Sequence, residues 1–317
     1  MAALSDWEES AMKKLKFLVS LRDEDNPYQK QNETAARDAA HRLGVDAEIL
    51  YANNDAITQS EQLLNVIQSP KDLRPDGIVC APVGTTLMRV AQHAAAAGIG
   101  WGLLNREGDY IEELRKAYEA PMFSVSPDQA EIGRIQGRQI GALLREGGMV
   151  LYLIGPSGNH ISEQRLTWMQ TAKPANVQVR TLTGDWTELG GFKAVTRWLQ
   201  LRTSHEAPVS LIAGQNDDMA MGARRAFEEQ TTGVLRERWL SLPYIGCDCC
   251  PGAGKEWIRR GLLTASIINP STAGLALELM VKAVQAKSQA PERTAVDPES
   301  FPAVEKLTAT LTHATAS

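Results

Sequence analysis

The chain has 317 residues, a length that allows about two domains at roughly 150 residues each. Hydrophobic residues make up 43% of it and charged residues 22%, a globular composition that excludes disordered, collagen-like and coiled-coil proteins. The net charge is −5 and basic residues form no long run, so we expect no nucleic-acid partner.

The sequence predicts no direct membrane insertion, because no apolar run approaches the roughly 20 residues that span a bilayer. Near the N-terminus, Asp6, Glu8 and Glu9 stand where a secretory leader carries positive charge. The localisation stays open at this stage: we expect a periplasmic protein if a leader has been removed, and a cytoplasmic protein if the chain is complete as given.

Short apolar runs alternate with segments of helical periodicity along the whole chain. The predicted strands cover residues 16–21, 47–52, 77–82, 98–104, 149–155, 177–182, 209–214, 243–247 and 262–268. The predicted helices cover residues 29–43, 58–68, 84–97, 128–145, 160–172, 187–202, 216–230, 252–260 and 272–287. This alternation is typical of doubly wound parallel sheets, and about ten strands are more than one such sheet comfortably holds. We therefore expect two lobes and a loop-rich tail from Ala290 with one late strand.

Polar and aromatic residues follow the predicted strands. They occupy residues 25–28, 105–106, 155–157, 185–186, 215–217, 247–248 and 269–270. Ligands of open parallel sheets bind at the carboxyl ends of the strands. Amides, carboxylates and guanidiniums hydrogen-bond to hydroxyls, and rings such as Tyr28 and Trp186 cover C–H faces. The pattern favours a small sugar or polyol as ligand, although Asn and Asp at these positions also cap helices.

Signatures of metal sites and enzymes are weak. The four cysteines, at 80, 247, 249 and 250, are too few and too clustered for a disulfide framework, and they lack a second ligand pair for zinc. The GPSGN run at 155–159 lacks the final Gly of a nucleophile elbow. Asp217 and Asp218 are compatible with a metal pair, but carboxylates also favour the start of a helix. We expect no metal and no cofactor, and a binding protein rather than an enzyme that uses Asp217, Asp218 or Glu163 as acid and base.

Six segments resemble the type I periplasmic sugar-binding proteins, a ribose-binding-protein-like family that is also similar to the effector domains of lactose-repressor-type regulators. They are DNPY at 25–28, NR at 105–106, SPD at 126–128 followed by Gly133 and Gly137, GQNDDMAMGARRAF at 214–227, IGCD at 245–248 and TASIINP at 264–270. The resemblance implies an α/β fold of two doubly wound parallel-sheet lobes joined by a three-segment hinge.

The resemblance also implies discontinuous lobes. The first would comprise residues 14–126 and 270–288, and the second residues 127–269 and 289–311, with flexible ends at 1–13 and 312–317. The crossings between the lobes would lie near residues 126–128, 247–250 and 269–289.

A ligand site between the lobes is implied by the same resemblance. Its implied ligand-binding residues are Asn26, Tyr28, Gln29, Asn105, Arg106, Glu163, Arg165, Trp186, Asn216, Asp248 and Asn269. The family usually has Asp at the position of Asn105 and Arg at that of Glu163, so an amino sugar, a methylated sugar or another polyol is expected rather than a plain pentose. Arg165, on the same predicted helix, is the alternative to Glu163 for facing the ligand.

The implied function is sugar or polyol binding by hinge closure, as the solute-binding component of an ATP-binding-cassette importer whose membrane component would be the partner. The alternative is a cytoplasmic sensor or regulatory domain that reads a sugar, for instance for a sensor kinase. We expect no DNA-binding head, because roughly 15 residues before the first strand are too few for a three-helix module.

Overall fold

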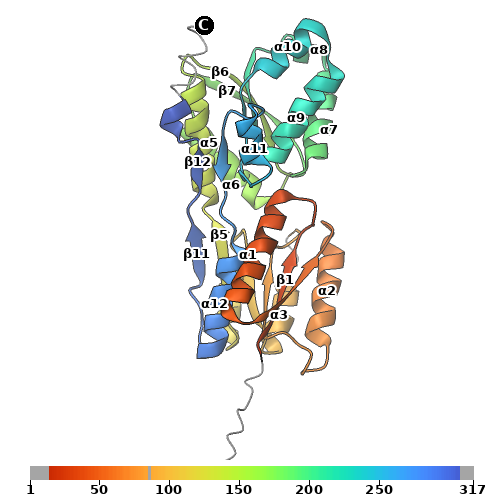
Figure 1. The fold of residues 1–317 in the computed structure, drawn as a ribbon, viewed down its shortest axis with the longest axis vertical. Helices are drawn as coiled ribbons and strands as arrows, with labels where there is room; N and C mark the ends of the chain where they lie inside the picture. The colour runs from red at the N-terminus through yellow and green to blue at the C-terminus, as the bar shows by residue number, and fades with distance from the viewer. Residues whose placement is uncertain (1–13, 85–86, 308–317) are drawn as a thin grey trace, which may run out of the picture.

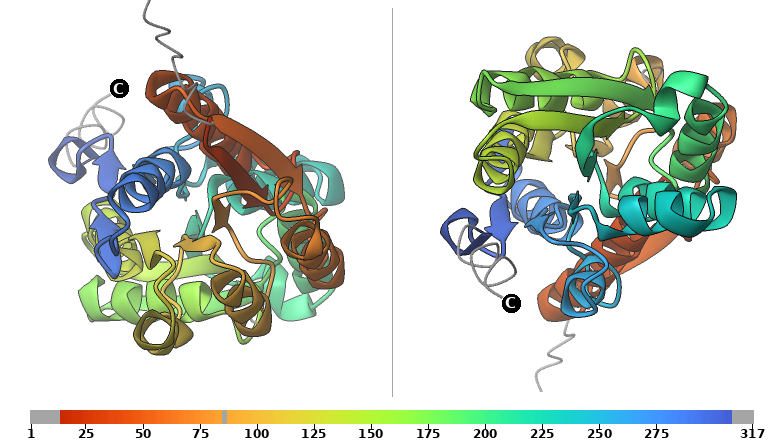
Figure 2. Two further views of the ribbon diagram at one scale, coloured as in Figure 1. Left: turned by 90° about the horizontal axis from the view of Figure 1, so that it is seen from below. Right: turned by 90° about the horizontal axis from the view of Figure 1, so that it is seen from above.

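The computed structural model describes residues 14–84 and 87–307. Two α/β bodies lie one above the other along the long axis of the molecule (Figure 1), and each is built on its own parallel sheet. We call the body with the six-stranded sheet the first lobe and the body with the four-stranded sheet the second lobe. Views along the long axis show helices on both sides of the strands (Figure 2). The predicted class, two doubly wound parallel-sheet lobes, is confirmed.

The first lobe holds a parallel sheet in the strand order β11-β5-β4-β3-β1-β2. Its strands are β1 (Lys16–Leu21), β2 (Asp46–Tyr51), β3 (Gly77–Cys80), β4 (Gly100–Leu104), β5 (Met122–Pro127) and β11 (Arg293–Val296). Its helices are α1 (Pro27–Leu43), α2 (Ala56–Gln68), α3 (Met88–Ala96), α4 (Tyr110–Ala117) and α12 (Ala273–Ala286). Neighbouring strand residues point to opposite faces, so Val19 joins the core under α1 and α12, whereas Leu18 joins the core under α2 to α4.

The second lobe holds a parallel sheet in the order β7-β6-β8-β9. Its strands are β6 (Gly148–Ile154), β7 (Val177–Thr183), β8 (Val209–Gly214) and β9 (Tyr244–Ile245), beside the antiparallel pair β10 (Ser266–Ile268) and β12 (Glu299–Phe301). Its helices are α5 (Gln129–Leu143), α6 (His160–Ala172), α7 (Glu188–Leu199), α8 (Arg202–His205), α9 (Asp217–Gln230), α10 (Gly233–Ser241) and α11 (Gly254–Arg259). An aromatic cluster fixes one face, where the rings of Phe227 and Trp239 stack with centroids 4.6 Å apart.

The described chain passes between the lobes after β5, after β10 and after β11. The first crossing lies between Pro127 and Gln129, and the second lies between Ile268 and Ala273. The predicted crossing at residues 247–250 is wrong, because this segment is tied to the second lobe: the Asp217 amide donates to the Cys247 carbonyl, and the Cys249 amide donates to the Asp217 carboxylate at 2.7 Å.

The tail also differs from the prediction that residues 289–311 belong to the second lobe. β11 pairs in parallel with β5 at the edge of the first sheet, and only β12 returns to the second lobe to pair with β10. The two strands run along one side of the molecule (Figure 1). Without β11, the strand β5 would lie at the edge of the first sheet with unpaired backbone N–H and C=O groups. Pairing with β11 satisfies these groups. The predicted flexible ends, 1–13 and 312–317, lie outside the described residues.

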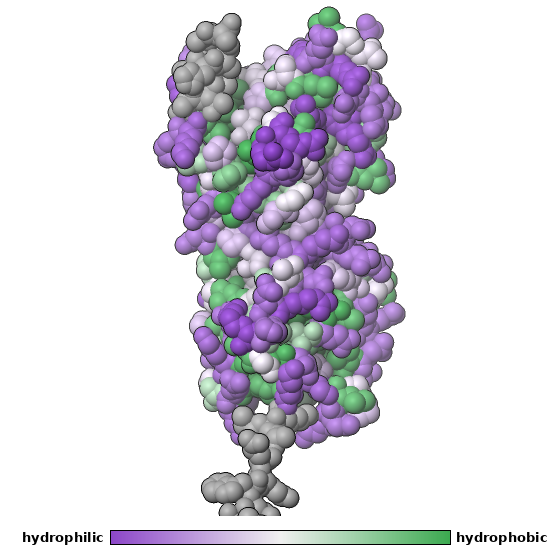
Figure 3. Space-filling model, viewed as in Figure 1, coloured by the Kyte–Doolittle hydropathy of each residue, from purple (hydrophilic) through white to green (hydrophobic). Residues whose placement is uncertain are grey.

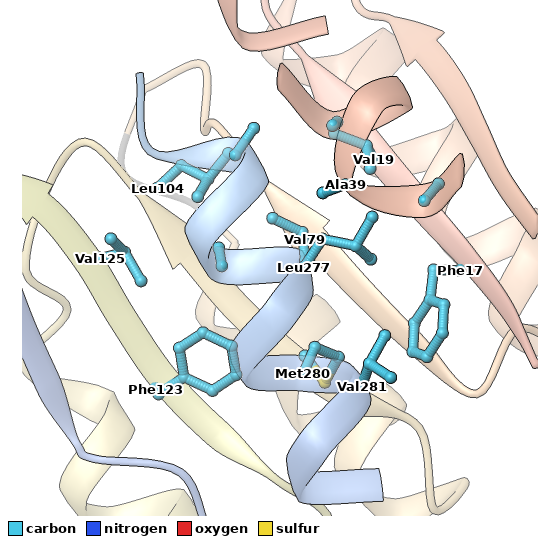
Figure 4. Packing of buried hydrophobic residues seen from close by; sticks show 14 of the residues in the cluster. Phe17, Val19, Ala39, Val79, Leu104, Phe123, Val125, Leu277, Met280 and Val281 are labelled. Atoms are coloured by element: carbon cyan, nitrogen blue, oxygen red, sulfur yellow. The ribbon is translucent and has the colours of Figure 1, made fainter. Parts of the chain in front are cut away.

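The helix α12 anchors the second crossing in the core of the first lobe. Figure 4 shows Leu277, Met280 and Val281 facing strand residues that include Phe17 and Val79. Close packing requires glycine beneath the helix, because a Cβ at Gly77 would lie 2.7 Å from the Cγ of Met280. The chain therefore returns from the second lobe into a tightly packed position.

At the surface, hydrophobic residues on the face in Figure 3 lie in small groups between hydrophilic ones. Within the described ranges, no helix has both the length and the apolar character that crossing a membrane requires.

Truncating the core side of α12 should destabilise the protein. Leu277 is fully buried, so Leu277→Ala should lower the free energy of unfolding by about 2–5 kcal/mol in urea denaturation. The control is Leu73→Ala at a position that is 61% exposed, where a change within about 0.5 kcal/mol is expected. Equal losses in the two variants would contradict the packing described for α12.

Candidate ligand-binding site

A cavity of about 740 Å³ is lined by residues of both lobes. Its wall comes mainly from the loops at the carboxyl ends of strands in the two parallel sheets, the edge where such sheets bind ligands. The volume is within the range of about 300–1,000 Å³ that small-molecule sites occupy. All of the ligand-binding residues expected from the sequence line this cavity except Glu163.

Asn26 begins the first-lobe side of the wall and has two roles. Its Oδ1 caps α1 by accepting from the backbone amides of Tyr28, at 3.0 Å, and Gln29, at 3.1 Å. Its Nδ2 donates to Oδ2 of Asp218 in the second lobe at 3.2 Å. Gln29 accepts from the Arg22 amide at 3.2 Å and thereby holds the loop after β1. One asparagine therefore both starts a helix and links the lobes.

Tyr28 and Asn105 form the floor of the first-lobe side. The Tyr28 hydroxyl lies 2.9 Å from Asn105 Oδ1 and 2.9 Å from the Pro270 carbonyl. Asn105 has a φ of 64°, a left-handed conformation that Asn tolerates better than most residues, and its Oδ1 also accepts from Thr272 at 2.8 Å. These contacts fix the amide of Asn105, and no described contact uses its Nδ2. Arg106 lies beside it and donates to the Gly84 carbonyl at 2.6 Å.

Arg165, not Glu163, faces the cavity from α6. Arg165 is 4% exposed, and it donates to Gln129 Oε1 at 2.8 Å and to the Gln215 carbonyl at 2.6 Å. Glu163 is exposed and lies outside the cavity wall. Residues two apart on a helix point in nearly opposite directions, so the two side chains cannot both reach the cleft. The expectation that Glu163 contacts the ligand is corrected.

Trp186 and Asn216 form the second-lobe wall. The backbone of Trp186 is left-handed, with φ 74°, and its carbonyl accepts from Asn216 Nδ2 at 2.8 Å. Asn216 Oδ1 in turn caps α9 by accepting from the Met219 amide at 3.0 Å. The indole Nε1 of Trp186 is buried without a hydrogen-bond partner in the described structure. The guanidinium of Arg165 lies 5.6 Å from the centre of the Trp186 ring.

Asp248 and Asn269 close the wall near the hinge. Asn269 Nδ2 donates to Asp248 Oδ1 at 2.9 Å, whereas Asn269 Oδ1 is buried without a partner among the described residues. Burial raises the pKa of Asp248 to about 6, and the guanidinium of Arg165 limits the rise. The carboxyl group of Asp248, which has a pKa of about 6, therefore lies beside Asn269, whose Oδ1 accepts no described hydrogen bond.

Asp218 is a wall residue that was not among the ligand-binding residues expected from the sequence. It lines the cavity from the first turn of α9, and its pKa is raised to about 7, first by burial and then by the carboxylates of Asp248, Glu188 and Asp23. Asp217, next to it, points into the protein instead and accepts from Ser266 Oγ at 2.6 Å. The position of Asp218, two residues after a strand-end asparagine, is the signal that could have identified it.

Gln129 was also missed, since no strand was predicted at residues 122–127. It accepts from Arg165 and donates to the Asn105 carbonyl at 3.2 Å, so it connects the two sides of the cleft. In residues 14–84 and 87–307, no group of three or more His, Cys, Asp or Glu side chains is arranged to hold a metal ion.

The raised pKa of Asp218 predicts a pH-dependent stability difference. An unfolded Asp has a pKa of about 3.9, so between about pH 4 and pH 7 the folded state binds more protons at Asp218, and this group's contribution to stability falls as pH rises. Asp218→Asn removes that dependence. The melting temperature of Asp218→Asn relative to the unsubstituted protein should therefore rise from about pH 5 to about pH 8. Glu163→Gln, at an exposed position, is the control, and a flat difference for Asp218→Asn would contradict the assignment.

Comparison with known proteins places this geometry in a family. A family model described as a periplasmic binding protein domain matches residues 17–288. Ribose import binding protein RbsB of Escherichia coli (strain K12) is 26% identical over 244 residues, which cover 76% of this chain and 75% of that protein. A periplasmic solute binding protein of an ABC transporter from Actinobacillus succinogenes 130z, with bound D-allose, has a TM-score of 0.78 at 20% identity and covers 93% of this chain and 100% of its own. The fructose-binding periplasmic domain of a hybrid two-component system has a TM-score of 0.74 at 22% identity, with 95% and 96% covered. The chain therefore belongs to the periplasmic binding protein family, with the type I fold that its motifs predicted.

Proposed function

We propose that the chain binds a small sugar or polyol in the cavity between its lobes and closes around it by hinge motion. The observation that carries this proposal is the composition of the cavity wall, which combines amide, carboxylate and guanidinium groups of both lobes with the aromatic side chain of Trp186. A polyol has hydroxyls that donate and accept, and these groups offer both functions. The indole covers an apolar C–H face.

Hinge closure is supported by contacts between the lobes around the cavity. Asn26 of the first lobe donates to Asp218 of the second, and Tyr28 packs against Cys250 and Ala253. A ligand that touches both walls stabilises this closed arrangement by the contacts that it makes only there. The same closure excludes water and strengthens the hydrogen bonds inside.

Delivery of the ligand to an ATP-binding-cassette importer is the role we propose for this binding. The relatives named for ribose import and for ABC transport match most of the chain. A sensor role is the second candidate, because the fructose-binding domain of a hybrid two-component system has the same fold over 95% of the chain. We propose binding without turnover, since Asp217 is engaged in holding the loop at Cys249 rather than exposed as a partner for acid–base work.

A thermal-shift screen tests the proposed binding. Pentoses, hexoses, amino sugars and polyols are added in excess to the full chain. A ligand present at about 100 times its Kd should stabilise the folded state by about 2.7 kcal/mol and raise the melting temperature. No rise with any member of the panel would overturn the proposal.

A substitution at Asp248 tests whether the ligand binds in the cavity. Asp248→Ala should weaken the binding of the best ligand at least about tenfold in calorimetry, because a hydrogen bond to a charged group is lost. Glu163→Ala also removes a carboxylate, but outside the cavity, and it should leave the affinity unaltered. A loss of affinity in Glu163→Ala, with none in Asp248→Ala, would place the ligand elsewhere.

A further inference from the structure

The cavity wall contains more acidic than basic groups. Its carboxylates are the six of Asp23, Asp25, Asp185, Glu188, Asp218 and Asp248. Its guanidiniums are the four of Arg22, Arg106, Arg165 and Arg225, and no Lys or His lines it in the described structure. Charges buried in such a wall are costly unless they are paired.

The arginines are mostly engaged with other partners. Arg225 donates to Glu188 at 2.6 Å, and Arg106 donates to a backbone carbonyl. Arg165 donates to Gln129 and to the Gln215 carbonyl, although its charge also reaches Asp248. No described arginine or lysine forms an ion pair with Asp218 or Asp248.

Asp218 is the least compensated of these carboxylates. Its one described hydrogen bond comes from the neutral amide of Asn26. The charged groups that act on it most strongly are Asp248, Glu188 and Asp23, and all of them raise its pKa, as burial does. The closed cavity therefore holds neighbouring carboxylates that repel one another.

Asn269 gives an independent indication of the missing partner. Its side chain is 3% exposed, and its orientation is fixed because Nδ2 must face the Asp248 carboxylate as donor. Its Oδ1 is consequently a buried acceptor with no donor among the described residues. Asn269 lines the same cavity and a buried acceptor left unpaired is unfavourable, so an N–H or O–H group of a ligand that reaches Oδ1 would be favoured.

This inference rests on the proposed function and narrows its ligand. We propose that the ligand is an amino sugar or amino polyol whose ammonium group lies beside Asp218 and Asp248, with the Oδ1 of Asn269 accepting from the same end of the molecule. An ammonium group offers three N–H donors and one positive charge, whereas a hydroxyl offers a donor without the charge. The four guanidiniums of the same wall disfavour a simple polyamine and leave donors for the ligand's hydroxyls.

Matched pairs of ligands test the proposal. Calorimetry on the full chain compares D-glucosamine with D-glucose, D-galactosamine with D-galactose, D-mannosamine with D-mannose, and 1-amino-1-deoxy-D-sorbitol with D-sorbitol. The measurements are made at about pH 7, where an amine with a pKa near that of an α-amino group is mostly protonated. At least one amine should bind at least about tenfold more tightly than its neutral parent.

Variants that replace a carboxylate by a neutral amide test which residue causes the preference for the amine. Asp218→Asn should lower the ratio of amine to parent affinity towards one, and Asp248→Asn is the second variant if the first does not fold. Glu163→Gln removes a carboxylate outside the cavity and should keep the ratio of the unsubstituted protein.

The outcomes separate this inference from the proposed function. Equal or tighter binding of every neutral parent, or a ratio that neither Asp218→Asn nor Asp248→Asn alters, overturns the inference and leaves sugar binding intact. Failure of all amines and all neutral parents to bind overturns the proposed function and the inference together.

Discussion

Each helix that starts at the cleft leaves backbone amides without a partner, and the cavity depends on how those amides are satisfied. Asn26 and Asn216 accept from the first turns of α1 and α9 through Oδ1 and use Nδ2 for other contacts, to Asp218 and to the Trp186 carbonyl. Asn26 and Asn216 therefore cap helices and also form part of the cavity wall. An amide performs both tasks because its two ends have opposite hydrogen-bonding character.

Neighbouring residues in one helical turn have different tasks for a similar geometric reason. Asp217 points into the second lobe and accepts from Ser266 and from the Cys249 amide, so it holds the loop after β9. Asp218, one residue later, lines the cleft, and among the described residues its side chain has a hydrogen bond only from Asn26. Burial raises the pKa of both carboxyl groups, but only Asp217 has hydrogen-bond donors from its own lobe to offset it.

The continuous apolar strands could be predicted because a buried parallel strand such as β1 has a distinctive composition. The strand β5 was missed because MFSVSP alternates apolar and polar residues, and with it Gln129 was missed as a wall residue. The pairing of β11 with β5 was not predictable, since RTAV is half-exposed and short and its partner is set by tertiary structure. Strand ends contain most of the expected ligand-binding residues that line the cavity, whereas the choice between Glu163 and Arg165 needed the direction in which each side chain leaves α6.

The position of Asp218 connects ligand charge to the closure of the lobes. Its hydrogen bond to Asn26 crosses the cleft, so closing the lobes would shield this carboxylate from water and bring it towards Asp23 of the first lobe, while Asp248 stays beside it in the second lobe. Without a ligand, closure would therefore carry the cost of burying carboxylates that repel one another. A cationic group beside Asp218 and Asp248 would offset this cost, which is largest in the closed state because the first lobe then covers these carboxylates. The energy that selects the ligand would then be the same energy that closes the hinge, because a ligand shifts a conformational equilibrium only by its different affinity for the two states.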